Sequence, residues 1–216
     1  MDKKIVYANQ KEIKLASEGS SELSPAARAV INFLNSDVFL EYLQKLTGIK
    51  EILISDPYLS GGGYHEIKSG GVLKVHADFN KHPRMNLDRR LNLLLYLNKD
   101  WDLSWGGNLE LYNINDLSKP AVSIEPLFNR CVIFTTTSFT YHGHPEPLAC
   151  PEDQSRRSIA LYYFSTGRPD GEVSTDKHST LFVETKGEKF SPEFRTFIAD
   201  WVPPIAIRGI KKLFKL

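Results

Sequence analysis

The sequence has few cysteines and no long apolar run, and each shortage excludes a class of protein. Its 2 cysteines, Cys131 and Cys150, are too few and too widely spaced for a small secreted domain held together by disulfides. No stretch approaches the roughly 20 consecutive apolar residues of a membrane-spanning helix. The polar residues 1–4 are not followed by the apolar segment of a signal peptide. We therefore expect a soluble protein of the reducing cytoplasm.

The sequence also lacks a strong net charge, internal repeats and low-complexity linkers. Its 27 basic and 26 acidic residues give a net charge of +1, which provides no overall field to attract nucleic acid, and no nucleic-acid partner is expected. The composition, 41% hydrophobic and 25% charged, is that of a globular rather than a disordered chain. We predict a single domain over residues 1–216.

Helical patterns lie at the two ends of the chain. Residues 24–48 predict two helices: Ser24 can cap the first, Pro25 suits its first position, and Gly48 ends the second. Residues 190–216 predict a helical tail that is basic and amphipathic towards its end. The tail is expected to pack on the domain, although contact with a membrane surface is the alternative reading of its basic, amphipathic pattern. Residues 1–23 predict a loose arm or an edge strand.

Between the helical ends, over about residues 51–168, the pattern is that of short strands separated by turns. The strand-like segments are residues 51–55, 72–78, 91–97, 108–112, 121–124, 130–135 and 158–164. Several short alternating strands with turn signals between them are typical of a β-sandwich or jelly roll. We therefore predict a mainly β fold with flanking α-helices. The polar residues 79–90 predict a loop.

His76 and Asp78 form the pattern with the clearest chemical meaning. Residues i and i+2 of a strand point to the same face, so the imidazole and the carboxylate leave the strand side by side. Two histidines and one carboxylate bind non-haem iron and leave coordination positions open. The second histidine is either His142 or His144, which share strand parity. Pro145 marks the strand end beside His144, which gives His142 a modest preference.

An arginine on a later strand is the candidate anion-binding residue. Residues 156–164 read as one strand whose two faces begin with Arg156 and Arg157. Small residues, Ser158 and Ala160, follow Arg156 on its face and leave room for a ligand. A guanidinium binds a carboxylate through two parallel hydrogen bonds. We therefore choose Arg156, while the alternative is that both arginines are solvated at the start of the strand.

Taken together, these motifs resemble the prolyl 4-hydroxylase-type branch of the 2-oxoglutarate- and Fe(II)-dependent oxygenases. The resemblance covers about residues 60–165, and the stretch formed by residues 96–101 and 106–109 (YLNKDW and GGNL) is especially similar to the oxygen-sensing prolyl hydroxylases. The motifs, in order, are His76-Ala77-Asp78, LLYLNKDW at 94–101, GGNLEL at 106–111, IEP at 124–126, RCVIF at 130–134, YHGH at 141–144 and RRSIALYY at 156–163.

The resemblance implies a fold and a set of site residues. The fold is a double-stranded β-helix, a jelly-roll, cupin-like barrel whose open end holds the iron. The implied metal ligands are His76, Asp78 and His142. The implied 2-oxoglutarate-binding residues are Arg156, Tyr96, Leu109 and, at a spacing that differs by about one residue, His65. Ser158 joins them from the strand-face argument. The segment between His142 and Arg156 is longer than in most relatives, and His144 replaces an apolar residue.

The resemblance further implies an enzyme that uses Fe(II), 2-oxoglutarate and O2, with ascorbate as an optional reductant. It would hydroxylate an unactivated C–H bond and release succinate and CO2. We expect a small-molecule substrate, such as an amino acid, a sugar or a natural-product intermediate. A prolyl or other protein side chain is the alternative substrate. A jelly roll that binds a ligand without catalysis is the alternative from another class.

Overall fold

The computed structural model describes residues 4–9, 12–17, 23–169 and 176–185, and these form a large antiparallel β-structure with two helices beside it. The paired strands follow the order β8-β7-β10-β5-β2-β4-β11-β6-β9. The described strands do not close this path into a ring. Their bounds are β1 (Lys4–Asn9), β2 (Glu12–Ser17), β3 (Ile54–Ser55), β4 (Gly63–Lys68), β5 (Leu73–Ala77), β6 (Asp88–Tyr96), β7 (Leu109–Tyr112), β8 (Val122–Ile124), β9 (Cys131–Thr135), β10 (Tyr141–His144), β11 (Ser155–Ser165) and β12 (Leu181–Phe182).

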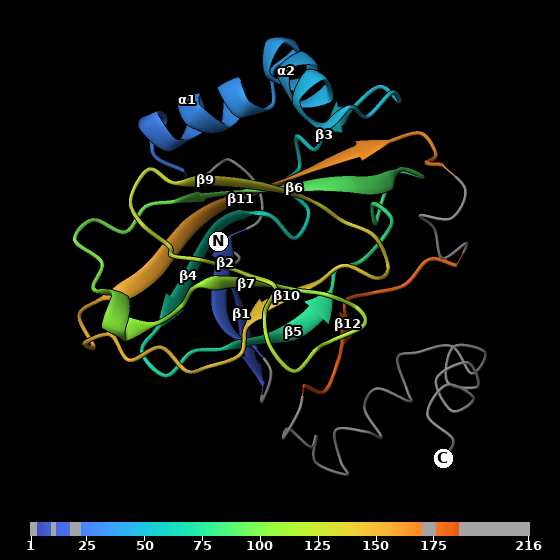
Figure 1. The fold of residues 1–216 in the computed structure, drawn as a ribbon. Coiled ribbons are helices and arrows are strands. Elements are labelled where there is room, and N and C mark those ends of the chain that lie inside the picture. Colours follow the sequence, from blue (N-terminus) through green and yellow to red (C-terminus); the bar gives the residue numbers. More distant parts are fainter. Residues whose placement is uncertain (1–3, 10–11, 18–22, 170–175, 186–216) are drawn as a thin grey trace. The chain divides into compact units, whose positions relative to one another are not determined.

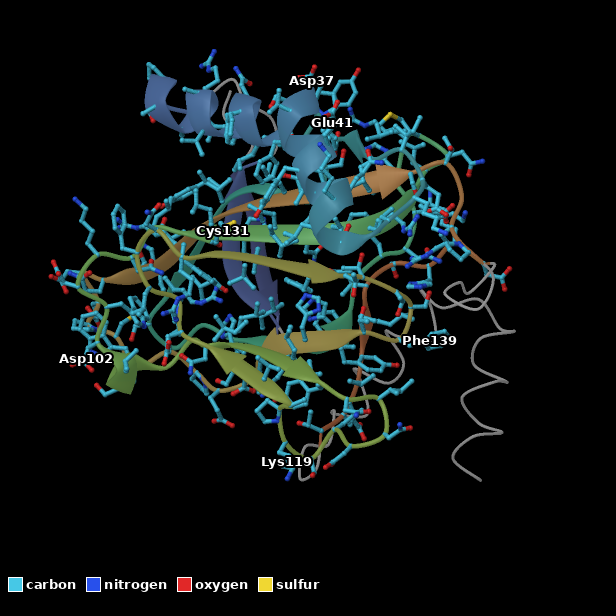
Figure 2. All side chains as sticks on the ribbon, turned by 45° about the horizontal axis from the view of Figure 1, so that its top comes forward. Asp37, Glu41, Asp102, Lys119, Cys131 and Phe139 are labelled. Atoms are coloured by element: carbon cyan, nitrogen blue, oxygen red, sulfur yellow. The ribbon has the colours of Figure 1, made fainter. Side chains whose placement is uncertain are left out.

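The two predicted helices between residues 24 and 48 are confirmed. They are α1 (Pro25–Leu34) and α2 (Asp37–Thr47). The Ser24 hydroxyl accepts a hydrogen bond from the backbone of Ala27, and Gly48 ends α2 with a left-handed φ of 72°. Figure 1 shows both helices on the same side of the sheet region that contains β6, β9 and β11. In Figure 2, Asp37 and Glu41 mark the face of α2 that is directed to solvent.

The helices cover one face of β6 and β11, and the opposite face of these strands is left for the site. Alternate side chains of both strands join the helices in one apolar core, which contains Ile31, Leu34, Leu43, Leu91, Leu93, Ile159, Leu161 and Tyr163. The hydroxyl group of Tyr163 donates to the Leu34 carbonyl at 2.9 Å and ties the sheet to the end of α1. The two faces predicted for the strand after Arg156 are therefore the two faces observed.

The structure differs from the predicted strand pattern at four places. Only residues 54 and 55 of the predicted strand 51–55 are in a strand. β4 was not predicted, although it lies between β2 and β11 in the pairing order. The predicted loop 79–90 is too long, because β6 already begins at Asp88. β1, β2 and β12 extend the sheet beyond the predicted core of residues 51–168.

Three other sequence predictions meet the structure as follows. Cys131 and Cys150 are both free thiols. Within the described part of the chain, no helix is long and apolar enough to cross a membrane. The predicted tail at residues 190–216 lies outside the described residues.

Candidate active site

His76, Asp78 and His142 come together from two neighbouring strands. Their candidate ligand atoms all lie within 4.8 Å of one another. His76 Nε2 is 3.5 Å from Asp78 Oδ1, and His142 Nε2 is 3.4 Å from Asp78 Oδ2. The two imidazole centroids are 4.4 Å apart. Two nitrogens and a carboxylate oxygen converge on one point, as the sequence pattern requires of a metal site.

The register of β10 against β5 decides which histidine joins the pair. His142 lies directly opposite His76, whereas His144 lies opposite Leu73. The register shifts between these two pairs, because two residue steps along β10 correspond to three residue steps along β5. His144 is buried and lines the same cavity, but it is not in the group whose ligand atoms converge.

Both histidines of the group are suited to metal binding in their neutral form. His76 Nδ1 lies 2.8 Å from the Lys74 carbonyl, which can only accept, so Nδ1 carries the proton and Nε2 offers its lone pair. Burial lowers the pKa of His142 to about 3, although the carboxylate of Asp78 acts in the opposite direction. His142 is thus a neutral imidazole at neutral pH.

Asp78 stays ionised at the same place. Burial on its own would raise its pKa, but the Arg89 guanidinium and the two histidines outweigh burial and hold the pKa well below its usual value. The site therefore presents one carboxylate charge beside two imidazole nitrogens to an incoming cation.

A second group of residues surrounds Arg156, whose side chain is buried, with 6% of its surface exposed. Its Nε donates to the carbonyl of Gly107 at 2.6 Å, and its Nη2 donates to the hydroxyl of Tyr96 at 3.0 Å. Among the residues that the structure describes, no carboxylate pairs with Arg156. Arg157 is exposed by contrast, and it faces Glu66 at 3.4 Å.

One cavity is lined by residues of both groups. Asp78, His142 and Arg156 all contribute to its wall. The other lining residues come from seven strands and include the predicted Ser158, Leu109 and His65. Tyr96 is fully buried and reaches the site through its contact with Arg156 rather than through the cavity wall. The cavity therefore brings together the carboxylate of Asp78, the imidazole of His142 and the guanidinium of Arg156.

Three neighbours of the site were not assigned a role from the sequence. Arg89 donates from Nη2 to Asp78 Oδ2 at 3.0 Å, although its position was predicted to be in a loop. Tyr162 lines the cavity, and its ring packs against the Arg89 guanidinium. Phe182 of β12 lies beside His76, with ring centroids 5.3 Å apart. The alternation that placed Ser158 on the cavity face also predicts Tyr162 there, but nothing local predicts Phe182.

Asn80 attaches the segment that carries β12 to the site. Its carboxamide donates to the carbonyl of Asp176 at 2.8 Å and accepts from the backbone of His178 at 2.9 Å. The His178 Nε2 lies 2.8 Å from the hydroxyl of Ser138. Residues 176–183 therefore run along the metal-site strand β5, which they meet through β12.

Comparison with known protein families gives one matching family over the region of the site. Residues 62–164 match the model of the 2OG-Fe(II) oxygenase superfamily. These residues include all four side chains of the candidate metal and anion sites, which lie between His76 and Arg156.

The chain is also similar to prolyl hydroxylases. It is 33% identical over 79 residues to the prolyl 3-hydroxylase OGFOD1 of Mus musculus, a match that covers 35% of this chain and only 14% of the mouse protein. The crystal structure of a Pseudomonas putida prolyl-4-hydroxylase superposes with a TM-score of 0.54 at 16% identity, covering 76% of this chain and 79% of the bacterial one.

A viral structure has the same fold. The viral collagen prolyl hydroxylase of Paramecium Bursaria Chlorella virus-1, solved as a 2OG complex, superposes with a TM-score of 0.50 at 10% identity, covering 72% of this chain and 81% of the viral one. At these identities the two structures support the fold alone, and the predicted jelly-roll class is confirmed.

Proposed function

We propose that this chain, whose residues 62–164 match the model of the 2OG-Fe(II) oxygenase superfamily, is a 2-oxoglutarate-dependent hydroxylase. In this proposal His76, Asp78 and His142 hold Fe(II) and Arg156 binds 2-oxoglutarate. The observation that carries the proposal is the single cavity lined by Asp78, His142 and Arg156. A diacid bound there would meet a metal at one end and a guanidinium at the other.

The donor set fits ferrous iron. Two neutral imidazoles and one carboxylate are the ligands typical of non-haem Fe(II) oxygenases, and they leave coordination positions for a co-substrate and O2. When bound, Fe(II) with 2-oxoglutarate and O2 supplies the oxidising chemistry that places oxygen on a C–H bond and releases succinate and CO2. The protein supplies the geometry around that chemistry.

The surroundings of Arg156 fit the distal carboxylate of 2-oxoglutarate. Its Nε and Nη2 are held by the neutral acceptors Gly107 and Tyr96. Because a buried guanidinium without a carboxylate partner is costly, a carboxylate from a bound molecule would stabilise it. Leu109 and Ser158 lie on the same cavity wall, one apolar and one hydroxylated, where they would contact the carbon chain and the carboxylate.

Aromatic rings would limit access of water to the metal end of the cavity. Phe134 packs edge-on against His142 with centroids 5.0 Å apart, and Phe182 lies 5.3 Å from His76. Their apolar surfaces keep the imidazoles in place and exclude solvent from the region where hydrogen abstraction would occur.

Two classes of substrate fit the proposed chemistry. The sequence analysis favoured a small molecule. The similarity to the prolyl 3-hydroxylase OGFOD1 supports a prolyl residue of a protein instead. The matched segment spans 14% of that relative, so a prolyl residue is a candidate substrate for this chain.

The test measures succinate formation from 2-oxoglutarate by the full-length chain with Fe(II), with and without ascorbate. The substrate panel contains proline-containing peptides, free amino acids and sugars, and each product is analysed for the addition of one oxygen atom. Substrate-stimulated succinate formation supports the hydroxylase. If the protein binds Fe(II) and 2-oxoglutarate but forms no succinate, either with or without a substrate, the non-catalytic binding protein is supported instead.

A further inference from the structure

The carboxylate of Asp78 has two unlike oxygens. Oδ2 accepts two hydrogen bonds, from Arg89 Nη2 at 3.0 Å and from Asn92 Nδ2 at 2.7 Å. Oδ1 receives neither of them and lies 3.5 Å from His76 Nε2, while Oδ2, besides its two hydrogen bonds, lies 3.4 Å from His142 Nε2. A carboxylate with one oxygen held by two donors offers the other oxygen for coordination.

We infer that Arg89 and Asn92 are positioning residues that hold Oδ2 of Asp78 and present Oδ1 to the metal. This inference rests on the proposed metal site. The two residues also hold each other, because Arg89 donates from Nε and Nη2 to the side-chain oxygen of Asn92 at 3.0 and 2.7 Å. Asn92 thus uses both ends of its carboxamide, and its orientation is fixed. The three side chains form one hydrogen-bonded unit, which we call the Asp78 clamp.

Two aromatic rings contact the Arg89 guanidinium. Its central carbon lies 3.5 Å from the ring centroid of Tyr162 and 4.3 Å from that of Phe79. The hydroxyl of Tyr162 donates in turn to the carbonyl of Gly61 at 2.8 Å, which anchors one of the rings. The two rings are edge-on to each other at 82°, so they contact the guanidinium from two directions and restrict the direction of its hydrogen bond to Asp78.

A bulge in β6 turns Arg89 towards Asp78. Alternation from Asn92 would place Arg90 on the cavity face. Against β11, however, Leu91 pairs with Tyr163 and Arg89 pairs with the next residue, Phe164. Two residues of β6 therefore oppose one step of β11, and the parity of the strand reverses. Arg90 points the other way, to Glu51 at 2.8 Å and to the hydroxyl of Ser165 at 2.9 Å.

The arginine pair supplies a matched control. Arg89 and Arg90 are adjacent, both are buried, with 1% and 4% exposed, and each makes an ion pair. Only Arg89 contacts the candidate metal site. If both arginines were purely architectural, losing either one would destabilise the fold and would have the same effect on metal affinity. The clamp predicts instead that metal affinity falls only when Arg89 is replaced.

The experiment measures binding of Mn(II) and Co(II) by titration calorimetry, together with the visible absorption spectrum of the Co(II) protein. No turnover is needed. Arg89→Met and Asn92→Leu are expected to weaken metal binding by roughly tenfold to a hundredfold each, the usual cost of losing a partner of a metal ligand. Both should change the Co(II) spectrum. The Arg90→Met protein should keep wild-type metal affinity and spectrum.

Arg89→Lys separates geometry from charge. A lysine keeps the positive charge but lacks the planar fork, so affinity should stay well below wild type. Full recovery with lysine would show that charge alone suffices, and the positioning role would be wrong. If Arg89→Met does not fold, Asn92→Leu carries the test, because it keeps the arginine and its ring contacts.

The outcomes distinguish this inference from the proposed function. Wild-type affinity and an unchanged spectrum in Arg89→Met, or an equal loss in Arg90→Met, would overturn the clamp while the metal site stands. Failure of the wild-type protein to bind either metal would overturn the proposed function itself. The Arg89→Met/Asn92→Leu double variant should lose less metal affinity than the product of the two single fold-losses, which would support one shared clamp.

Discussion

Two buried arginines flank the candidate active site, and their surroundings are opposite. Arg89 faces the carboxylate of Asp78 at 3.0 Å, so its charge is balanced within the protein. Arg156 faces only the neutral oxygens of Gly107 and Tyr96. Taking an ion out of water costs several kcal/mol unless a partner compensates it. The comparison shows which arginine belongs to the architecture of the site and which is left for a ligand.

The same contrast distinguishes the two halves of the cavity, a metal half at Asp78 and His142 and a second half at Arg156. The metal half offers a carboxylate oxygen and two imidazole nitrogens, which are ligands suited to a cation. The half around Arg156 is suited to an anion. A co-substrate with a metal-chelating end and a carboxylate end would satisfy both halves at once. The predictions below test each half in turn.

The largest effect is expected from removing a metal ligand. His76→Ala or Asp78→Ala should lower succinate formation by about a thousandfold or more, because the metal chemistry has no substitute in the chain. The measurement is coupled turnover of 2-oxoglutarate at saturating Fe(II), with circular dichroism to confirm the fold. Turnover close to wild type in either folded variant would contradict the ligand assignment.

The second effect concerns the arginine without a carboxylate. Arg156→Lys should raise the KM for 2-oxoglutarate by about tenfold to a hundredfold, equivalent to the roughly 1.5–3 kcal/mol of a hydrogen bond to a charged group. Arg157→Lys is the control, because that side chain is exposed and faces Glu66. Equal changes in the two variants would mean that Arg156 does not contact the co-substrate.

The third effect tests the close backbone approach that holds Arg156. Gly107 has φ of +78°, and an added Cβ would lie 2.6 Å from Leu148 Cδ2 and 2.9 Å from Arg156 Cδ. Gly107→Ala should lower the free energy of unfolding by about 1–3 kcal/mol from crowding, in addition to about 1–2 kcal/mol from the left-handed backbone. It should also weaken 2-oxoglutarate binding.

Gly106→Ala is the matched control for that variant. Its φ is +72°, yet an added Cβ would have nothing within 4 Å. Only the backbone contribution should remain, so chemical denaturation should show a smaller loss and 2-oxoglutarate binding should be unchanged. Equal losses in both variants would show that Arg156 adjusts freely to the added methyl group.

The smallest effect is a pH dependence at the metal half. The pKa of His142 falls from 6.5 to about 3 on burial. Between these values the unfolded chain binds the proton and the folded chain does not, so stability falls as pH falls from 7. For the metal-free protein the loss between pH 7 and pH 6 should be below about 1 kcal/mol from this residue.

His142→Gln removes this contribution. The free energy of unfolding of the variant should therefore change less between pH 7 and pH 5 than that of the wild type. Asp78 does not contribute in this range, because its lowered pKa acts only below its usual value of 3.8. Burial lowers the pKa of His178 as well, and its contribution of the same sign is present in both proteins. Identical slopes would mean that folding does not lower the pKa of His142.

Short-range patterns in the sequence predicted the parts of the site that depend on one element. Alternation along a strand places Arg156, Ser158 and Tyr162 on one face because side chains repeat every two residues. The same period puts His76 and Asp78 side by side. Capping by Ser24 and the glycine at position 48 predicted the helices, because those signals act within a few residues.

What the sequence by itself determined was the kind of candidate site, a pair of side chains placed to bind a metal and an arginine on a face with room for a ligand. Only the tertiary structure decided which histidine joins the pair, that Arg89 rather than Arg90 turns to Asp78, and that Phe182 covers His76. Register shifts in β5 and β6 and a strand pairing from a distant segment set these contacts. Such shifts reverse strand parity and depend on the packing of the whole sheet, so no local period can predict them.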